Sequence, residues 1–289
     1  MAAGPLVAIV GETASGKSAL AMRLAEVFDG EIICADSRTI YKGMDIGTAK
    51  PTAADRALIP HHVLDVVTPD QRFSAADFKL QAEAAIADIQ SRGKLPIMVG
   101  GTGLYVDAVL YNFSFREAAD PSERARLEKL SVEELQQALA GKDIPLPNNP
   151  QNPRHLIRAL EANGQSAERQ VLRGKTLVLG LKVDKDILEK RIEKRIDDMI
   201  TTGLIPEVKS MAAKYSWEAP GLQTIGYREF RDFLSGKNTL EEAALRLKQS
   251  TKRFAKRQRT WFKRSPDIQW IDGFEQAKEQ VQNLLQDNA

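Results

Sequence analysis

Short apolar runs alternate with amphipathic stretches over the first third of the chain. The runs have the length and β-branched content of buried strands, and the stretches between them repeat their apolar positions with a helical period. Strands are expected at Leu6–Val10, Glu31–Ala35, His61–Val67 and Leu95–Val99, and helices at Ser18–Val27 and Ser74–Ser91. Buried strands that alternate with helices are typical of an α/β fold with a parallel sheet.

The pattern changes at about residue 116 and returns at about residue 172. Between these points the chain is charged and helical, with a helical stretch at Asp120–Ala140, a loop at Gly141–Pro153 and a helix at Pro153–Asn163. A strand at Thr176–Val183 then resumes the sheet, and helices follow to the end at Asp184–Thr202, Pro206–Lys214, Tyr227–Leu234 and Leu240–Lys263. We therefore expect an α/β core formed by residues 1–115 and 173–289, with a helical insertion at residues 116–172.

A complete phosphate-binding motif, Gly-x-x-x-x-Gly-Lys-Ser, lies between the first strand and the first helix. Its glycines let the backbone curl so that successive N–H groups point at phosphate oxygens, beside the positive end of the helix. Lys17 adds a point charge, and Ser18 offers a hydroxyl to Mg²⁺. The residues expected to bind phosphate are Gly11, Thr13, Ala14, Ser15, Gly16, Lys17 and Ser18.

Two further polar groups follow strands of the expected sheet. Ligands of parallel sheets bind at the carboxyl ends of the strands, where Asp36 and Thr102 are expected. Asp36 can act as a general base or as a partner of Mg²⁺, and the Thr102 hydroxyl can bind an oxyanion or a substrate amine. The strand before Thr102 ends without the carboxylate that supports Mg²⁺ in P-loop ATPases, so a pyrophosphate leaving group suits this loop better than ATP poised for hydrolysis.

A strongly basic segment lies near the end of the chain. Nine Lys or Arg residues and no acidic residue lie between Arg246 and Arg264, interleaved with Phe254, Trp261 and Phe262. A solvated helix face explains most charge runs, but the lack of counter-charges over about five helical turns favours a polyanionic partner such as a nucleic acid.

The composition narrows the class of protein. The chain of 289 residues is 43% hydrophobic and 28% charged, as in ordinary soluble proteins. Its single cysteine, Cys34, excludes an intrachain disulfide and a Cys/His zinc site, and is expected to be a buried packing thiol. His61 and His62 have no third ligand at a suitable spacing, which favours a structural role or a base contact over a metal site. No stretch is long enough for a membrane span and no basic leader precedes the first strand, so a cytoplasmic protein is expected. Nothing in the sequence suggests an obligate interface, which favours a monomer.

Motifs spread over essentially the whole chain point to one family. They are the phosphate loop and the segments Asp36–Tyr41, Gly43–Pro51, Pro60–His62, Phe73–Phe78, Val99–Tyr105, Asn152–Glu161, Ile225–Glu229 and Ala255–Phe262. In these motifs and in their order the chain resembles the bacterial tRNA dimethylallyltransferases, also called tRNA isopentenyltransferases. The run Asp-Ile-Gly-Thr-Ala-Lys-Pro is particularly specific.

The resemblance implies a P-loop NTPase-like parallel sheet flanked by helices, an inserted helical tRNA-binding subdomain and a helical C-terminal region. It implies transfer of a dimethylallyl group from dimethylallyl diphosphate to N6 of the adenosine 3′-adjacent to the anticodon, position 37 of the tRNA, with release of pyrophosphate. Lys17 is then expected to neutralise diphosphate charge and Ser18 to hold Mg²⁺. Asp36 is expected to take the N6 proton, and Thr102 to hold the amine.

The same resemblance implies contacts with tRNA. Because the adenine must leave the anticodon stack, the family needs a pocket around the flipped base and basic cover for the RNA backbone. The implied contacts are Asp36, Ser37, Arg38, Thr39, Thr102, Arg124, Asn152, Pro153, Arg154, His155, Lys256 and Arg257.

The chain departs from the family's pattern in three places. Glu12 stands where the family usually has proline, and its carboxylate is expected either to point out of the loop or to weaken diphosphate binding. Thr39 replaces the common glutamine, and the insertion is shorter than usual, with an unusual loop at Pro145–Gln151.

Other functions remain open. A P-loop kinase of nucleotides or small metabolites predicts ATP turnover, with Arg191 and Arg195 on one helix face as a lid, although a solvated face or a tRNA contact explains that pair equally well. An adenylate isopentenyltransferase acts on free AMP, which needs neither the insertion nor the basic segment. An RNA-binding module with a vestigial phosphate loop keeps its RNA affinity when Lys17 is replaced by alanine.

Overall fold

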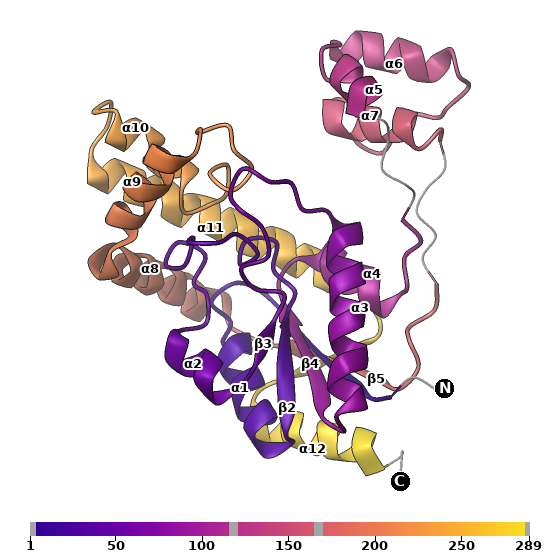
Figure 1. The fold of residues 1–289 in the computed structure, drawn as a ribbon, viewed down its shortest axis with the longest axis vertical. Coiled ribbons are helices and arrows are strands. Elements are labelled where there is room, and N and C mark those ends of the chain that lie inside the picture. Colours follow the sequence, from indigo (N-terminus) through magenta and orange to yellow (C-terminus); the bar gives the residue numbers. More distant parts are fainter. Residues whose placement is uncertain (1–3, 116–120, 165–169, 287–289) are drawn as a thin grey trace. The chain divides into compact units, whose positions relative to one another are not determined.

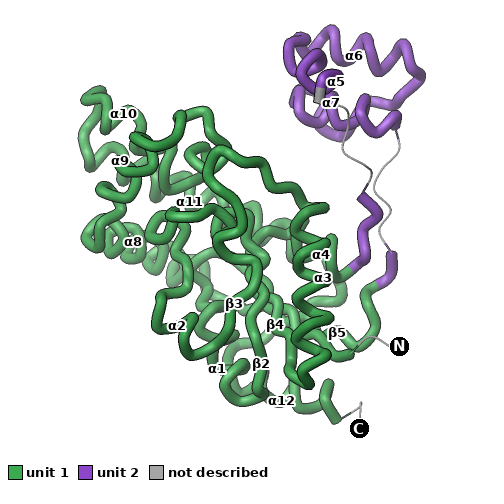
Figure 2. Tube along the Cα trace, in the orientation of Figure 1, with its two compact units in different colours: residues 1–110, 172–289 green, residues 111–171 purple. Residues whose placement is uncertain are grey.

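The computed structural model of the protein describes residues 4–115, 121–164 and 170–286. The chain divides into two compact units (Figure 2), with residues 1–110 and 172–289 in unit 1 and residues 111–171 in unit 2. The sequence predicts these divisions at residues 116 and 172.

Unit 1 is built on a six-stranded parallel sheet (Figure 1) with the strand order β3-β2-β4-β1-β5-β6. The strands are β1 (Leu6–Val10), β2 (Gly30–Cys34), β3 (His61–His62), β4 (Leu95–Gly100), β5 (Thr176–Leu181) and β6 (Ile268–Ile271). The expected α/β class is confirmed. Every residue of β1 is buried, as its position between β4 and β5 requires.

Two expectations about the strands were wrong. The strand expected from His61 onward ends at His62, because the backbone turns at Val63 and Asp65, which have φ of 59° and 53°. The edge strand β6 was not expected, since only helices were predicted for that part of the chain. Its four residues are too few to show a period, and parallel pairing with β5 provides the context that makes them a strand.

Helices cover both faces of the sheet. Those of unit 1 are α1 (Lys17–Val27), α2 (Ala53–Leu58), α3 (Ala75–Ser91), α4 (Gly103–Leu110), α8 (Lys185–Thr202), α9 (Leu204–Lys214), α10 (Arg231–Leu234), α11 (Leu240–Phe262) and α12 (Phe274–Gln286). On one face α1 and α12 form a core that includes Val7, Leu24 and Val281. Phe78 of α3 is buried outside that core while α3 contacts β2 and β4, so α3 covers the opposite face (Figure 1).

Cys34 is a packing residue in the first of these cores, as predicted. It is 8% exposed, and burial raises the pKa of its thiol to about 12. The thiolate is therefore not populated at neutral pH, which argues against a nucleophilic role.

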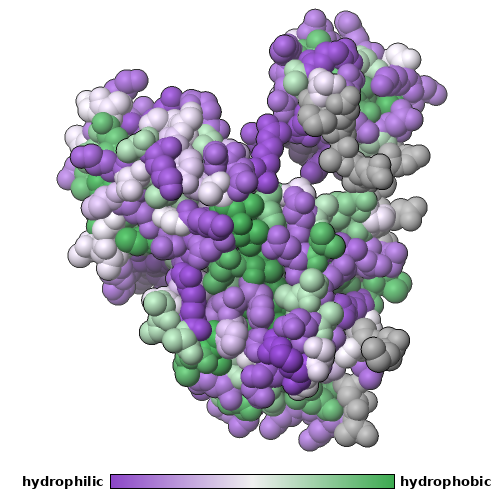
Figure 3. All heavy atoms as spheres, viewed as in Figure 1, coloured by the Kyte–Doolittle hydropathy of each residue, from purple (hydrophilic) through white to green (hydrophobic). Residues whose placement is uncertain are grey.

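The face drawn in Figure 3 is predominantly hydrophilic. The large exposed apolar side chains, such as Leu58, Leu80 and Leu245, belong to separate helices. Over the described residues, no helix is both long enough and apolar enough to cross a membrane.

The motif Gly43–Pro51 is held by the buried ammonium of Lys50. Its Nζ donates to the carbonyl oxygen of Tyr41 at 2.6 Å, to Oδ1 of Asp45 at 2.8 Å and to Oδ1 of Asp65 at 2.5 Å. The Lys50 side chain is 1% exposed, whereas those of Asp45 and Asp65 are 55% and 32% exposed. Lys50 therefore joins three points of the chain from inside the loop.

We expect Lys50→Met to lower the free energy of unfolding by about 2–3 kcal/mol, because it leaves two carboxylates and a carbonyl without their buried donor. Urea unfolding followed by circular dichroism measures the change. Lys42→Met, at an exposed lysine of the same segment, is the matched control and should change the free energy of unfolding by less than about 0.5 kcal/mol. Equal effects of the two substitutions would contradict this role.

The same motif is also held from α9. The carboxylate of Glu207 accepts hydrogen bonds from the successive backbone N–H groups of Asp45, Ile46 and Gly47 at 2.8–2.9 Å, and from the hydroxyl of Tyr227 at 2.5 Å. These four donors satisfy an anion that is otherwise costly to desolvate. The motif is therefore held to α9 and to Tyr227 through a single carboxylate.

Unit 2 is a small helical unit with its own core. Its helices are α5 (Pro121–Leu127), α6 (Val132–Ala140) and α7 (Pro153–Glu161), and the buried side chains between them include Leu135, Leu139 and Leu156. The single helical stretch expected up to Ala140 is two helices, because Ser131 caps α6 by accepting from the N–H of Glu134.

Candidate functional site

The phosphate loop follows β1 and ends at the first turn of α1. Gly11, Ala14 and Gly16 have φ of 150°, 61° and 98°, values that curl the loop as the motif predicts. The buried hydroxyl of Ser15 has no hydrogen-bond partner among the described residues. A bound anion such as a phosphate would accept a hydrogen bond from this hydroxyl, so the unsatisfied donor is consistent with an anion site in the loop. Ser18 is exposed in the first turn of α1, so its hydroxyl is accessible to a Mg²⁺ that accompanies the phosphates.

Lys17 lies within this loop. Its Nζ donates to the carbonyl oxygen of Glu12 at 3.0 Å. Burial lowers the pKa of Lys17 to about 8; the carboxylate of Asp36 opposes this change, and the guanidinium of Arg195 adds to it. A desolvated ammonium beside a second cation gains free energy when an anion binds.

Two arginines of α8 reach over the phosphate loop. Nη1 of Arg191 donates to the carbonyl oxygen of Ser15 at 3.3 Å, and Nη1 of Arg195 lies 3.5 Å from Oγ1 of Thr13. Burial lowers the pKa of Arg195. The spacing of the pair in the sequence indicates a shared helix face, but it does not show that this face meets the loop.

Asp36 and Thr102 lie at the carboxyl ends of the neighbouring strands β2 and β4, as predicted. Oδ1 of Asp36 accepts from the N–H of Arg38 at 2.9 Å. Oγ1 of Thr102 accepts from the N–H of Ser37 at 3.0 Å and donates to its Oγ at 3.3 Å. The approach of the two loops requires Gly100, because a Cβ there would lie 2.0 Å from a backbone oxygen of the loop after β2.

Thr39 occupies an internal position. It is 6% exposed, and its hydroxyl donates to the carbonyl oxygen of Asp36 at 3.3 Å. The Thr39 side chain therefore supports the loop that carries Asp36, and the tRNA contact expected of it stays a prediction.

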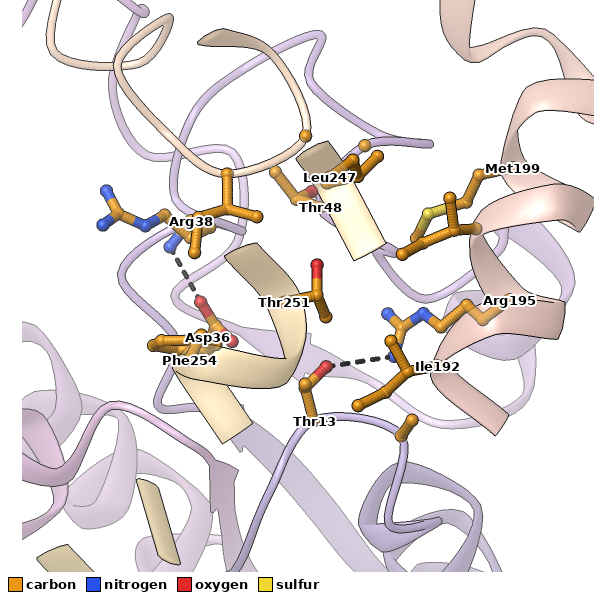
Figure 4. Close-up of a pocket in the computed structure, with 15 residues that line it drawn as sticks. Thr13, Asp36, Arg38, Thr48, Ile192, Arg195, Met199, Leu247, Thr251 and Phe254 are labelled. Atoms are coloured by element: carbon orange, nitrogen blue, oxygen red, sulfur yellow. Dashed lines mark hydrogen bonds between the residues drawn. The ribbon is translucent and has the colours of Figure 1, made fainter. Parts of the chain in front are cut away.

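A pocket opens beside these groups (Figure 4). One side is polar, with Thr13, Asp36, Arg38 and Arg195. The other side is mostly apolar and comes from α8, α11 and the segment after α9; it consists of Ile192, Ile196, Met199, Ile225, Leu247, Thr251 and Phe254. The pocket therefore suits a molecule with an anionic end and a compact apolar end. The apolar side was missed in the sequence because its residues come from three separate segments.

The C-terminal part of α11 also contacts the phosphate loop. Gln258 is 4% exposed; its Oε1 accepts from the N–H of Thr13 at 2.8 Å, and its Nε2 donates to the carbonyl oxygen of Gly101 at 2.9 Å. Arg259 donates from Nε to a carboxylate oxygen of Glu12 at 2.6 Å. The Glu12 side chain is 10% exposed and paired with Arg259 of α11, so its carboxylate does not point into solvent.

The basic segment is not without counter-charges, because acidic residues from other elements pair with part of it. Lys248 pairs with Asp197, and Lys252 with Glu189 and Glu193, all on α8. Arg246 pairs with Asp232, and Arg259 with Glu12. Over the described ranges, no acidic group pairs with the exposed residues Arg253, Lys256, Arg257, Lys263 and Arg264. The surface available to a polyanion is therefore smaller than the sequence indicates.

The expected tRNA contacts of unit 2 differ in exposure. Arg124 forms an ion pair with Glu161 at 3.0 Å, and Asn152 caps α7 by accepting from the N–H of Arg154. Arg154 and His155 are exposed in the first turn of α7, as is Pro153. Arg124 and Asn152 therefore hold unit 2 together, and the exposed side chains at the start of α7 remain accessible.

The histidine pair has a structural role. Nε2 of His62 lies 2.8 Å from Oε2 of Glu31, and Nδ1 of His61 lies 2.7 Å from the carbonyl oxygen of Ile59. Among the described residues, no three His, Cys, Asp or Glu side chains are grouped so that they could hold a metal ion.

Comparison with known proteins agrees with this geometry. The tRNA dimethylallyltransferases of Roseiflexus sp. (strain RS-1) and Bacillus velezensis (strain FZB42) are 46% and 39% identical to the chain, over 91% and 96% of its length and 92% and 95% of theirs. The crystal structure of a tRNA isopentenylpyrophosphate transferase from Bacillus halodurans is 39% identical, with a TM-score of 0.74, over 97% of this chain and 95% of that one.

A eukaryotic dimethylallyltransferase captured in crystallographic snapshots acting on tRNA is 29% identical, with a TM-score of 0.80, over 93% of this chain and 73% of that one. The family model of the IPP transferases matches residues 39–265. This match covers most of the chain and includes Thr102, α8 and α11. The chain therefore belongs to the IPP transferase family, whose parallel sheet has a P-loop NTPase-like fold.

Proposed function

We propose that this chain is a tRNA dimethylallyltransferase, which transfers a dimethylallyl group from dimethylallyl diphosphate to N6 of the adenosine 3′-adjacent to the anticodon. The observation that carries the proposal is the pocket, in which the phosphate loop and the half-buried Arg195 meet a carboxylate and an apolar wall. In this proposal the enzyme is a monomer, and it acts in the cytoplasm, where its tRNA substrate is found.

The phosphate loop and α8 hold the diphosphate in this proposal. Lys17, Arg191 and Arg195 neutralise the charge that grows on the bridging oxygen as the bond to the allylic carbon breaks. The unpaired hydroxyl of Ser15 donates to a phosphate oxygen. Ser18 would hold Mg²⁺ through its exposed hydroxyl, and the ion would supply further neutralisation of the leaving pyrophosphate.

Asp36 and Thr102 act on the acceptor. Asp36, which lines the pocket, takes the proton from N6 as the amine attacks the allylic carbon. Thr102 holds the amine with its hydroxyl, in a position set by Ser37. The apolar wall formed by Ile192, Phe254 and their neighbours receives the dimethylallyl group and keeps water from the allylic carbon.

The exposed cations are proposed to bind the RNA backbone. Lys256 and Arg257 of α11 and Arg154 and His155 of α7 are exposed. Contacts to phosphates set the position of the anticodon stem-loop but do not select the base, which is selected in the pocket after it leaves the stack.

A P-loop kinase remains the competing function. It is favoured by the two α8 arginines over the phosphate loop, an arrangement that also suits a transferred phosphoryl group. It is disfavoured by the end of β4, where Gly100, Gly101 and Thr102 stand in place of a Mg²⁺-supporting carboxylate.

Transfer of labelled dimethylallyl from its diphosphate, measured with Mg²⁺ on unmodified tRNA and separately on AMP, tests the proposal. Label in tRNA that disappears when the target adenosine is changed supports it. Label in AMP would indicate an adenylate isopentenyltransferase. No label in either acceptor, with ATP consumption in the presence of a small acceptor, would indicate a kinase.

Diphosphate binding is expected to weaken above pH 8. Lys17 has a pKa lowered to about 8, so it is protonated below that pH and loses its charge above it, and the anion favours the protonated form. One pH unit above the pKa, the fraction of protein with a protonated Lys17 has fallen about tenfold. KM for dimethylallyl diphosphate should therefore rise about tenfold between pH 7 and pH 9. Steady-state kinetics at saturating tRNA measures it. Lys17→Met should lack this rise; an equal rise in that variant would assign it to another group.

A further inference from the structure

The Glu12–Arg259 ion pair joins the phosphate loop to α11. Nε of Arg259 donates to Oε1 of Glu12 at 2.6 Å, and its Nη2 donates to Oε2 at 3.2 Å. Two parallel N–H···O contacts form the bidentate geometry that fixes both partners. The Glu12 side chain is 10% exposed and that of Arg259 is 30% exposed, so water screens the carboxylate poorly.

Glu12 lies in a loop that must accept a highly charged anion. Its carbonyl oxygen accepts from Nζ of Lys17 at 3.0 Å and from the N–H of Ser15 at 3.3 Å. The Glu12 residue therefore holds the lysine and part of the loop. An unneutralised carboxylate on the same residue would repel the diphosphate. The function proposed above assigns no role to Arg259, which the sequence groups with the cations that face a polyanion.

We infer that Arg259 is a positioning residue of the diphosphate site, which neutralises Glu12 and fixes the peptide that holds Lys17, and is not a contact for tRNA. This inference rests on the proposed function. The guanidinium of Arg259 makes both contacts with Glu12. A contact with an RNA phosphate would need the same guanidinium. Arg257, two residues earlier on α11, is exposed, with its guanidinium over the ring of Phe254.

Kinetics of four variants test the inference: Arg259→Ala, Arg259→Lys, Glu12→Gln and the double variant Glu12→Gln/Arg259→Ala. Arg259→Ala should raise KM for dimethylallyl diphosphate about tenfold and leave KM for tRNA within about twofold, because a carboxylate is left without its partner. Arg259→Lys retains the charge and should recover most of the loss. In the Glu12→Gln background, Arg259→Ala should change KM for the diphosphate by less than about threefold, because no charge is left to neutralise.

Arg257→Ala is the matched control on the same helix. It should raise KM for tRNA and leave KM for dimethylallyl diphosphate unchanged, the reverse of the pattern for Arg259. The inference is overturned if Arg259→Ala raises only KM for tRNA, or if it has the same effect with glutamate and with glutamine at residue 12.

Calorimetric titration with inorganic pyrophosphate and Mg²⁺ separates this inference from the proposed function, since it needs no transfer. Arg259→Ala should weaken pyrophosphate binding about tenfold, and the double variant should bind within about threefold of Glu12→Gln. This pattern in a protein that transfers no dimethylallyl would uphold the role of Arg259 and overturn the proposed function. Active transfer with unchanged pyrophosphate affinity in Arg259→Ala would overturn the role of Arg259.

Discussion

Asp36→Asn should slow dimethylallyl transfer by about 10²–10⁴-fold at saturating substrates, because the amide cannot take the N6 proton. The substitution keeps the shape of the side chain and an oxygen that can accept from the N–H of Arg38, so the loop after β2 should retain its geometry. Single-turnover transfer to labelled tRNA measures the rate of the chemical step. tRNA affinity, measured by filter binding, should remain within about threefold of the original protein.

Asp70→Asn provides the control for Asp36→Asn. Asp70 is an exposed carboxylate that does not line the pocket, so its replacement should leave transfer unchanged. A transfer rate in Asp36→Asn equal to that of the control would remove Asp36 from the mechanism. A loss of tRNA binding that accounts for the whole effect would make Asp36 a binding residue and not a base.

Lys17→Met should lower kcat/KM for dimethylallyl diphosphate by about 10²–10³-fold, since one preorganised cation at a developing oxyanion contributes that much. Methionine approximates the length and volume of the lysine stem, so the change removes the charge and the hydrogen bond to Glu12 with little change in packing. Steady-state kinetics with varied diphosphate, at saturating tRNA, measures the loss.

Lys42→Met, at an exposed lysine outside the pocket, is the control and should leave the kinetics unchanged. tRNA binding should survive Lys17→Met, because the exposed cations of α11 are untouched. Transfer that is insensitive to Lys17→Met would remove Lys17 from the diphosphate site. RNA binding without transfer in either protein would instead support an RNA-binding module whose phosphate loop has no function.

The strongest predictions from sequence concern features that short segments encode by themselves. The positive φ values of Gly11 and Gly16 belong to a motif whose glycines permit the curl. Asp36 and Thr102 could be placed together because parallel strands end at the same edge of a sheet. Cys34 was predicted to be buried from the apolar run around it.

The errors concern features that depend on partners distant in the chain. The basic segment looked free of counter-charges because Asp197 and Glu193, which pair with it, lie on α8. Glu12 looked misplaced because its partner, Arg259, is 247 residues away. The strand β6 went unrecognised because its four residues gain their conformation from pairing with β5.

The amino-acid sequence alone was sufficient for the α/β class, the phosphate loop, the place of Asp36 at the end of β2 and the family resemblance, because backbone preference and residue order are local properties. The composition of the pocket depended on the folded chain, since its apolar wall comes from α8, α11 and the segment after α9, and the arginines above the loop come from α8. Which charges are neutralised also depended on folding. Ion pairs form between side chains that packing brings together, and the distance between two residues in the sequence does not indicate whether they will pair.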